Sequence, residues 1–406
     1  MRRVSCLTDP QDLVNVYGER MRELLGHDAT ISLSRRNLQS PWYRITRADS
    51  LGDIDPWRHT DRLPLFDRGV LGDLLYGDEP VILDDFSVDP SDPAASYLAG
   101  VRSLAAIPHY DNGVALNMVL LLARRPAAFD HDQLPQMTLQ GNLFGRATNS
   151  LVLSRRLKEA YDIIDRELEI VSDIQRSLLP FEFPFIPSLK LSSDYQSSSR
   201  AGGDYFDFFP LGHGLYGILI ADVSGHGTPA AVLMAIVHAI AHLVPGGPHP
   251  PEHVMDFINR QLAARYTSSN GSFVTAFYAV FDADNRTLRY ANAGHPPPLR
   301  LRAAEASVHE LPSTRAGLPL GIIAESQFEQ DSVTLSPGDV LLFYTDGITE
   351  ARAPSGEMYG GDRLKSALSR AGLEKHPVPV LLEDLRAFCG SAPAGDDRTM
   401  LVAQVR

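Results

Sequence analysis

The chain has 406 residues, with 37 lysines and arginines against 50 aspartates and glutamates, so its net charge at pH 7 is −13. A composition of 44% hydrophobic and 21% charged residues is typical of a folded protein and excludes a largely disordered chain. The acidic balance argues against a nucleic-acid-binding protein, which needs a basic face. We therefore expect no nucleic acid among the partners.

Cysteine content and hydropathy bear on the cellular compartment. Cys6 and Cys389 are the only cysteines in the sequence, too few for a disulfide framework or a cysteine zinc site. The N-terminal stretch 1–14 has no apolar run of the signal-peptide kind. The longest apolar run, Val114–Ala123, is far shorter than the roughly 18 residues that a membrane helix needs. We expect a cytoplasmic protein without a membrane span.

Residues 1–148 are predicted to form a first domain of helices and short strands. Helical spacing of apolar residues opens it, and a strand is predicted at Pro80–Leu83. Its clearest signal is a tight turn containing Asn112-Gly113 between two apolar runs, Ser103–Tyr110 and Val114–Ala123. This pattern predicts a β-hairpin.

Residues 149–180 contain almost no glycine or proline and are predicted to form one long linking helix that ends at Pro180. Apolar positions alternate by four and three residues, which is the spacing of a coiled-coil seam. Two interpretations stay open: a helix packed on its own domain, or a parallel seam that makes a homodimer. The seam consists of Leu157, Tyr161, Ile164, Leu168, Val171, Gln175 and Leu178.

Residues 181–406 alternate strand-like runs with a few helices. Strands are predicted at Leu215–Ala221, Val340–Tyr344 and Met400–Ala403, and a helix at Pro229–Leu243. A further hairpin is predicted where Phe273–Phe281 and Leu288–Ala291 flank a polar turn.

Aspartates recur where strands of this third zone end, each beside a glycine or another small residue. Hard divalent cations such as Mg²⁺ and Mn²⁺ prefer oxygen ligands, so a cluster of these carboxylates would suit them. The alternative is that each aspartate caps a turn, which is the commoner role of a single Asp-Gly. Spacing alone does not bring them together. The carboxylates in question are Asp204, Asp207, Asp222, Asp346, Asp396 and Asp397.

Several motifs follow one another in the third zone. They are Ile174–Pro180, Gly202-Gly203-Asp204-Tyr205-Phe206-Asp207, Asp222-Val223-Ser224-Gly225-His226-Gly227, Asn292-Ala293-Gly294-His295-Pro296-Pro297, Pro319-Leu320-Gly321, Thr345-Asp346-Gly347 and Asp396-Asp397-Arg398-Thr399. In this order they resemble the SpoIIE/RsbU-type branch of the metal-dependent PPM protein serine/threonine phosphatases, and the resemblance covers nearly all of residues 170–406.

The resemblance implies an α/β (α+β) fold with two antiparallel sheets, helices outside and two metal ions, Mn²⁺ or Mg²⁺, at one edge. It implies that Asp222 bridges the metals and that the backbone carbonyl of Val223 binds one of them. Asp346 and Asp396 would complete the other, and Asp204 would hold the first metal directly or through water. Asp222, Asp346 and Asp396 are therefore the expected catalytic residues.

The remaining motif residues receive lesser roles. We expect Asp207 and Asp397 to support the site without binding a metal. His226 and His295 are candidates for the acid that protonates the leaving group, but hydrogen-bonding roles in loops are commoner for such residues. Cys389 lies outside every motif and fits no nucleophile pattern.

The first zone resembles a GAF domain more loosely. A GAF domain surrounds a pocket for a small ligand, although many serve only in dimerisation, and nothing here identifies a ligand. The resemblance rests on Gly77–Ile82, Val101–Pro108 and Phe129-Asp130.

Together these features predict a GAF-like domain (1–148), a helical linker (149–180) and a SpoIIE-type phosphatase domain (181–406). The expected reaction is hydrolysis of phosphoserine or phosphothreonine by a metal-activated water. The family's usual substrate is a phosphorylated STAS-domain anti-sigma antagonist. The GAF domain would regulate this activity through the helix. Two alternatives stay open: a signalling scaffold that is a weak catalyst, and a small-molecule phosphoesterase.

Overall fold

A computed structural model describes residues 6–52, 54–244, 248–268, 271–313, 317–372 and 374–406. The chain divides into two compact units, Met1–Asp162 and Ile163–Arg406. Residues 1–5 of the predicted first domain lie outside the described residues. Each unit is treated separately below.

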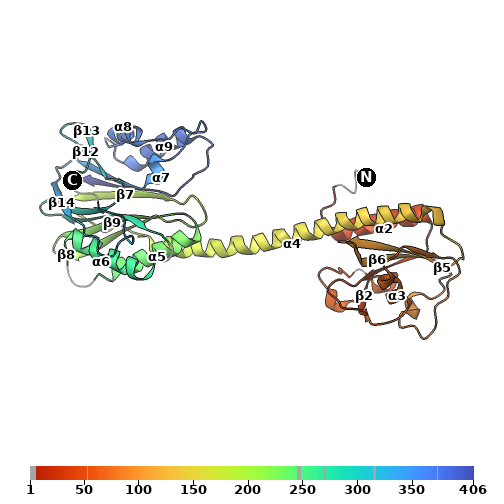
Figure 1. The fold of residues 1–406 in the computed structure, drawn as a ribbon. Coiled ribbons are helices and arrows are strands. Elements are labelled where there is room, and N and C mark those ends of the chain that lie inside the picture. Colours follow the sequence, from red (N-terminus) through yellow and green to blue (C-terminus); the bar gives the residue numbers. More distant parts are fainter. Residues whose placement is uncertain (1–5, 53, 245–247, 269–270, 314–316, 373) are drawn as a thin grey trace. The chain divides into compact units, whose positions relative to one another are not determined.

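The first unit is built on one antiparallel sheet with the strand order β3-β2-β1-β6-β5-β4 (Figure 1). The predicted hairpin at its centre is confirmed: Asp111 pairs with Val114 across a two-residue turn. Asn112 and Gly113 both have positive φ, as the tight hairpin turn requires. The elements are α2 (Pro10–Leu25), β1 (Ala29–Ser34), β2 (Tyr43–Arg47), β3 (Leu65–Phe66), α3 (Val70–Gly77), β4 (Val81–Leu83), β5 (Ser103–Asp111) and β6 (Val114–Ala123), with short 3-10 helices at Asp49–Leu51, Thr60–Arg62, Ala95–Tyr97 and His131–Gln133.

The two faces of this sheet are covered differently. Because strand residues alternate, Leu104 and Ala106 of β5 pack with Leu71 and Leu75 of α3 on one face. The residues between them, Ala105 and Ile107, pack on the other face with Met137 at the start of α4. The sheet is therefore a middle layer between α3 and the long helix.

Helix α4 runs from Leu134 to Leu178 and is 45 residues long. The helix therefore continues without a break across the predicted domain boundary at residue 148, and the predicted linker forms its second part. Leu157, Tyr161 and Ile164 of the predicted seam are 58%, 63% and 52% exposed. Gln175, in contrast, is buried within the second unit. The apolar stripe before residue 168 therefore has no partner in this chain among the described residues.

The second unit contains two five-stranded antiparallel sheets with the orders β14-β11-β10-β9-β8 and β13-β12-β15-β16-β7. The predicted strands, the helix at 229–243 and the second hairpin are all confirmed. The elements are β7 (Leu189–Gln196), β8 (Tyr205–Gly212), β9 (Leu215–Val223), α5 (Thr228–His242), α6 (Pro251–Arg265), β10 (Val274–Asp282), β11 (Thr287–Ala293), β12 (Leu299–Arg302), β13 (Ser307–Glu310), β14 (Gln330–Thr334), β15 (Val340–Tyr344), α7 (Asp346–Thr349), α8 (Gly361–Ala371), α9 (Pro377–Cys389) and β16 (Arg398–Val405).

Three apolar cores stack these elements into four layers (Figure 1). Phe277 of the first sheet and Phe343 of the second are in edge contact, with ring centres 5.8 Å apart, in the core between the sheets. A second core lies between the first sheet and helices α5 and α6, and a third between the second sheet and helices α8 and α9. The expected sandwich with helices outside is therefore confirmed.

No helix in the described part of the chain is long and apolar enough to cross a membrane.

Candidate functional site

Two predicted carboxylates come together at the end of the first sheet. Tyr205 of β8 pairs with Ala221 of β9, so the next residues in antiparallel register are Asp204 and Asp222. The N–H of Val223 donates to the carbonyl of Gly203 at 3.3 Å, which continues this pairing beyond the strand.

Two more carboxylates come from the second sheet. Tyr344 of β15 pairs with Met400 of β16, and the N–H of Thr345 donates to the carbonyl of Thr399 at 3.1 Å. The chain leaves β15 into Asp346, the first residue of α7, and enters β16 from Asp396. The negative charge of Asp396 contributes to raising the pKa of Asp346, after the larger effect of burial, so the two carboxylates face the same region.

Asp204 links the two sheets. Its carboxylate is 1% exposed and accepts hydrogen bonds from the hydroxyls of Thr345 at 2.8 Å and Thr399 at 2.6 Å. Sequence reasoning missed both threonines, although each stands inside a quoted motif, directly before Asp346 or two residues after Asp397. A signal was available: the same residue type recurs beside the aspartates in two separate motifs.

The electrostatics show that the predicted carboxylates form one cluster. Burial raises the pKa of Asp222 well above its ordinary range, and the charges of Asp204, Asp346 and Asp396 raise it further. Burial likewise raises the pKa of Asp204. Among the described residues, no three of these carboxylates have ligand atoms all within 4.8 Å of one another.

Asp397 holds the loop that precedes Asp204, and its charge also contributes to raising the pKa of Asp222. Its carboxylate is buried and accepts hydrogen bonds from the N–H of Ser198 at 2.7 Å, the hydroxyl of Ser197 at 3.1 Å and the N–H of Gly203. It thereby positions the loop that ends at Asp204.

Three glycines near the aspartates are required for close approach of the backbone. A Cβ on Gly347 would overlap the carbonyl oxygen of Asp397, and one on Gly202 would overlap the carboxylate of Asp397. A Cβ on Gly203 would lie 2.8 Å from the carbonyl oxygen of Val223. None of the three has a positive φ, so the close packing of the backbone, and not a left-handed conformation, is what requires glycine there.

The two motif histidines differ in their surroundings. His295 is buried, and burial lowers its pKa to about 3, so its ring is neutral at pH 7. Its ring lies 2.9 Å from the hydroxyl of Thr275, and its main chain is closed into a turn by Asn292. His226 lies on the exposed loop between β9 and α5. His295 therefore stabilises a turn, and its neutral ring is only a weak acid at neutral pH.

Asp207 does not join the carboxylate cluster. It lies on the side of β8 that faces α5, where its carboxylate contacts Tyr205, His238 and His242.

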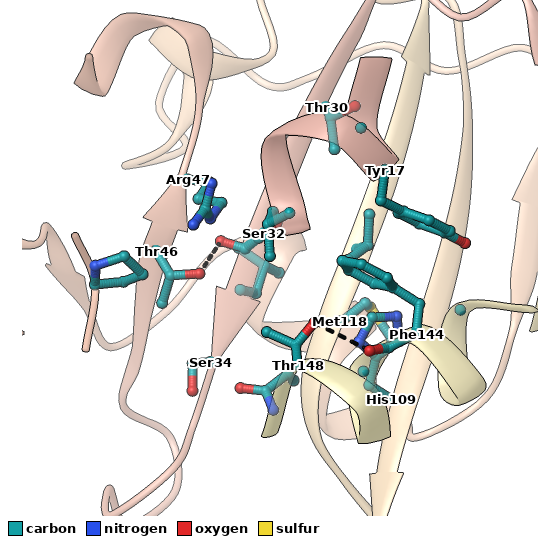
Figure 2. A pocket seen from close by; sticks show the side chains of 18 of the residues that line it. Tyr17, Thr30, Ser32, Ser34, Thr46, Arg47, His109, Met118, Phe144 and Thr148 are labelled. Carbon is teal, nitrogen blue, oxygen red and sulfur yellow. Dashed lines mark hydrogen bonds between the residues drawn. The ribbon is translucent and has the colours of Figure 1, made fainter. Parts of the chain in front are cut away.

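The first unit has a pocket of about 1550 Å³ between its sheet and helices α2 and α4 (Figure 2). Thr30, Ser32 and Ser34 of β1 line it, while Ile31 packs in the core on the opposite face of the sheet. The stacked rings of Tyr17 and Phe144, 3.7 Å apart, line another wall. Apolar side chains fill the face of the sheet that α3 covers, so the pocket lies on the other face, beneath α2 and α4.

The sandwich of two antiparallel sheets with helices outside is a PP2C-like fold. A solved structure of this class, the SiaA-PP2C domain of Pseudomonas aeruginosa, superimposes on 61% of this chain and 98% of its own, with a TM-score of 0.52 and 20% identity. That likeness shows a shared fold.

Residues 212–406 match the family described as Stage II sporulation protein E (SpoIIE). The chain is 27% identical over 296 residues to protein IcfG of Synechocystis sp., covering 66% of this chain and 46% of that protein. It is 31% identical over 194 residues to phosphoserine phosphatase RsbU of Bacillus subtilis, covering 48% and 56%. The chain thus spans about half the length of the curated relatives it matches.

The close packing of Gly347 against the backbone of Asp397 leads to a first prediction. Because a methyl group there would overlap the backbone of Asp397, Gly347→Ala should destabilise the folded protein by about 3 kcal/mol, the upper end of overpacking costs. Gly361→Ala is the matched control, since its Cβ would meet no atom within 4 Å. Urea unfolding followed by circular dichroism measures both; equal stability of the two variants would contradict the packing argument.

The raised pKa of Asp222 leads to a second prediction, for the metal-free protein. Above its ordinary pKa of 3.8 the folded state holds a proton that the unfolded state has lost, so this stabilisation disappears as pH rises toward the folded-state pKa. In EDTA, we expect the free energy of unfolding to fall by up to about 1.4 kcal/mol per pH unit for each such carboxyl.

The variant Asp222→Asn removes that titration and should flatten the slope between pH 5 and pH 8, measured by urea unfolding at each pH. The exposed Asp362→Asn is the control and should keep the wild-type slope. Identical slopes in wild type and Asp222→Asn would show that the carboxyl is not held in its protonated form.

Proposed function

We propose that the chain is a metal-dependent protein serine/threonine phosphatase. The observation that carries the proposal is the convergence of Asp204 and Asp222 from one sheet with Asp346 and Asp396 from the other. Like charges at close range are costly unless they are protonated or bind a cation. The match of residues 212–406 to the SpoIIE family supports the same conclusion.

The donors in this cluster fit a hard divalent cation, because all of them are oxygens. Asp222 and the carbonyl of Val223 would hold one Mn²⁺ or Mg²⁺ ion, with Asp204 binding directly or through water. Asp346 and Asp396 would hold the second ion together with Asp222. Bound there, the ions supply a nucleophilic hydroxide at neutral pH and neutralise the phosphoryl oxygens.

The protein's own residues orient this chemistry. The hydroxyls of Thr345 and Thr399 fix one oxygen of Asp204 and leave the other for the site. Asp397 holds the loop before Asp204 in place by accepting hydrogen bonds from the N–H groups of Ser198 and Gly203. The leaving alkoxide takes its proton from solvent or from the exposed His226, because His295 is buried and neutral.

The proposed substrate is a phosphorylated protein. The relative RsbU is named a phosphoserine phosphatase, which supports phosphoserine as the reacting group. The resemblance to the SpoIIE/RsbU-type branch supports a STAS-domain anti-sigma antagonist as the protein that carries it. Partner switching of that kind is a proposal for this chain.

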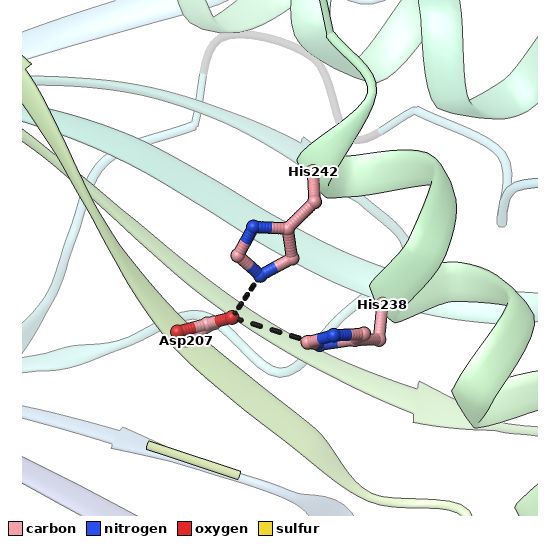
Figure 3. A group of neighbouring side chains, drawn as sticks. All are labelled: Asp207, His238 and His242. Atoms are coloured by element: carbon pink, nitrogen blue, oxygen red, sulfur yellow. Dashed lines mark hydrogen bonds and ion pairs between the residues drawn. The ribbon is translucent and has the colours of Figure 1, made fainter. Parts of the chain in front are cut away.

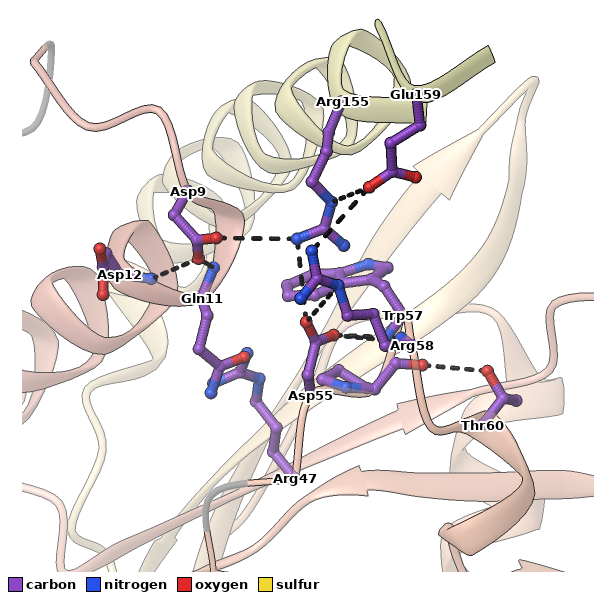
Figure 4. Close-up of polar contacts among 11 residues, drawn as sticks. Asp9, Gln11, Asp12, Arg47, Asp55, Trp57, Arg58, Thr60, Arg155 and Glu159 are labelled. Atoms are coloured by element: carbon purple, nitrogen blue, oxygen red, sulfur yellow. Dashed lines mark hydrogen bonds and ion pairs between the residues drawn. The ribbon is translucent and has the colours of Figure 1, made fainter. Parts of the chain in front are cut away.

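We further propose that the first unit, a GAF-like domain, regulates the activity through α4. The pocket of Figure 2 would take a small ligand, and the loop that carries Pro56 and Trp57 lines it. In the same loop, Oδ2 of Asp55 lies 3.8 Å from Nη1 of Arg155 on α4 (Figure 4). The same nitrogen lies 3.6 Å from Oδ2 of Asp9, at the start of α2. A ligand that moves this loop would therefore act on the helix.

At its other end, α4 contacts the loop before the carboxylate cluster. The buried amide of Gln175 donates to the carbonyl of Gly202 and accepts its N–H at 2.9 Å. A shift of the helix would pull on this loop and on Asp204 two residues later. This contact supports the helix as the regulatory connection.

The exposed seam residues Leu157, Tyr161 and Ile164 support a homodimer through α4. Such a stripe is typical of a parallel coiled coil, in which a second copy buries it.

The phosphatase proposal predicts that hydrolysis of p-nitrophenyl phosphate by the full chain needs Mn²⁺ or Mg²⁺ and is abolished by EDTA. Asp222→Asn should lower kcat at least about 1,000-fold, since it removes the residue shared by both ions. The control is Asp362→Asn on the surface. Metal-independent hydrolysis, or full activity of Asp222→Asn, would contradict the proposal.

The regulatory proposal predicts that Gln175→Ala lowers the activity of the full chain about 10-fold and raises the Mn²⁺ concentration needed for half-maximal rate. The exposed neighbour Asp173→Ala is the control. Steady-state kinetics over a Mn²⁺ series measures both. An unchanged metal requirement in Gln175→Ala would show that the helix does not control the loop.

A further inference from the structure

A second group of potential metal ligands lies outside the carboxylate cluster. Asp207 belongs to β8, and His238 and His242 belong to α5, one helical turn apart on the same face (Figure 3). Tyr205 packs in the core beneath α5, whereas Phe206 and Phe208 pack between the sheets. Because side chains alternate along a strand, Asp207 lies on the same face as Tyr205. It therefore points toward α5 and away from the core between the sheets.

The distances suit a small tetrahedral ion. The Nε2 atom of His242 lies 2.8 Å from Oδ2 of Asp207, and the Nδ1 atom of His238 lies 3.8 Å from the same oxygen. All three ligand atoms lie within 4.8 Å of one another. Tetrahedral zinc with bonds of about 2.1 Å separates its ligand atoms by about 3.4 Å, which falls between the two observed distances. Closing the site requires the ring of His238, whose Nδ1 lies 3.1 Å from the hydroxyl of Tyr205, to move toward Asp207 and the ring of His242 to move away from it.

The surroundings suit a site with three protein ligands and a water. The side chain of Asp207 is 9% exposed, that of His238 is 25% exposed and that of His242 is 46% exposed, so the cluster is closed toward the sheet and open toward solvent. The hydroxyl of Tyr205 donates to Oδ2 of Asp207 at 2.6 Å and orients the carboxylate from below. Such an outer partner is the usual companion of a metal ligand.

The surroundings of His238 favour the form of the ring that binds a metal. Burial lowers the pKa of His238, and the neighbouring His242 lowers it further, which opposes the effect of Asp207. A neutral imidazole is the form that binds a metal. Two nitrogens and one carboxylate oxygen favour zinc over Mg²⁺, which prefers oxygen ligands alone.

We propose that Asp207, His238 and His242 form a binding site for Zn²⁺ that is separate in position and in donor chemistry from the carboxylate cluster. Bound zinc would tie the last turn of α5 to β8. Helix α5 begins at Thr228, after the short loop that follows Asp222 and Val223 at the end of β9. The ion would thus restrain the helix that leads out of the proposed catalytic loop.

The test is calorimetric titration of the full chain with ZnCl₂ in the presence of millimolar Mg²⁺, which occupies oxygen-ligand sites. We expect one zinc site per chain in the wild type. His242→Ala removes one of the three protein ligands and should weaken zinc binding roughly 100-fold or more. His238→Ala should do the same. Mutation of a residue that only hydrogen-bonds to a ligand typically weakens metal binding about 10–100-fold.

The controls separate this site from the proposed catalytic one. His253→Ala removes an exposed histidine of the neighbouring helix α6 and should bind zinc as the wild type does. Asp222→Asn disables the carboxylate cluster and should also keep the zinc site. His242 is half exposed at the last turn of α5, so circular dichroism is expected to show a folded His242→Ala protein.

Co²⁺ provides a second measurement that does not depend on activity. A tetrahedral site with nitrogen ligands gives strong visible absorption, whereas an octahedral oxygen site gives very little. We expect the strong band in the wild type and in Asp222→Asn, and its loss in His242→Ala. Absence of zinc binding in the wild type, or zinc binding unchanged in both histidine variants, would overturn the proposal.

Discussion

The carboxylate of Asp204, buried between two sheets, is the constraint on which the rest of the second unit depends. A buried charge is expensive unless it is paired or hydrogen-bonded, and here two threonine hydroxyls from the opposite sheet supply the bonds. Thr345 directly precedes Asp346 and Thr399 follows Asp396 by three residues, so the bonds to Asp204 also restrain the segments that carry these two carboxylates. The same contacts join the ends of β8, β15 and β16 at one edge of the sandwich.

The loop before Asp204 shows how this edge is connected to the rest of the chain. Asp397 accepts from its backbone on one side, and Gln175 of α4 binds both polar groups of Gly202 on another. A side chain larger than hydrogen at Gly202 or Gly203 would separate these partners. The proposed regulation uses this arrangement: Gln175 and Asp397 hold the same loop, so a shift of α4 would act on Asp204 through the contacts of Gly202.

Much of the fold could be predicted from the sequence, because local patterns carry it. The Asn112-Gly113 turn, the buried run at Val340–Tyr344 and the proline at the start of α5 each specify an element through short-range physics. The contacts of Thr345 and Thr399 with Asp204 could not be predicted in this way, since they join residues 141 and 195 positions apart. The triad of Asp207 with two α5 histidines was missed for the same reason. Its partners lie 31 and 35 positions apart in sequence, on a strand and a helix that only the folded sheet brings together.

The central claim is that Asp204, Asp222, Asp346 and Asp396 hold divalent cations for phosphoryl hydrolysis. Anomalous diffraction from crystals of the full chain grown with Mn²⁺ tests it most directly, because manganese scatters anomalously and the peaks need no assumption about ligands. The account predicts two peaks beside Asp222, one reached by Asp346 and Asp396, with oxygen ligands at about 2.0–2.2 Å. Ordered carboxylates with no anomalous peak among them, in crystals whose protein hydrolyses phosphate esters, would contradict it.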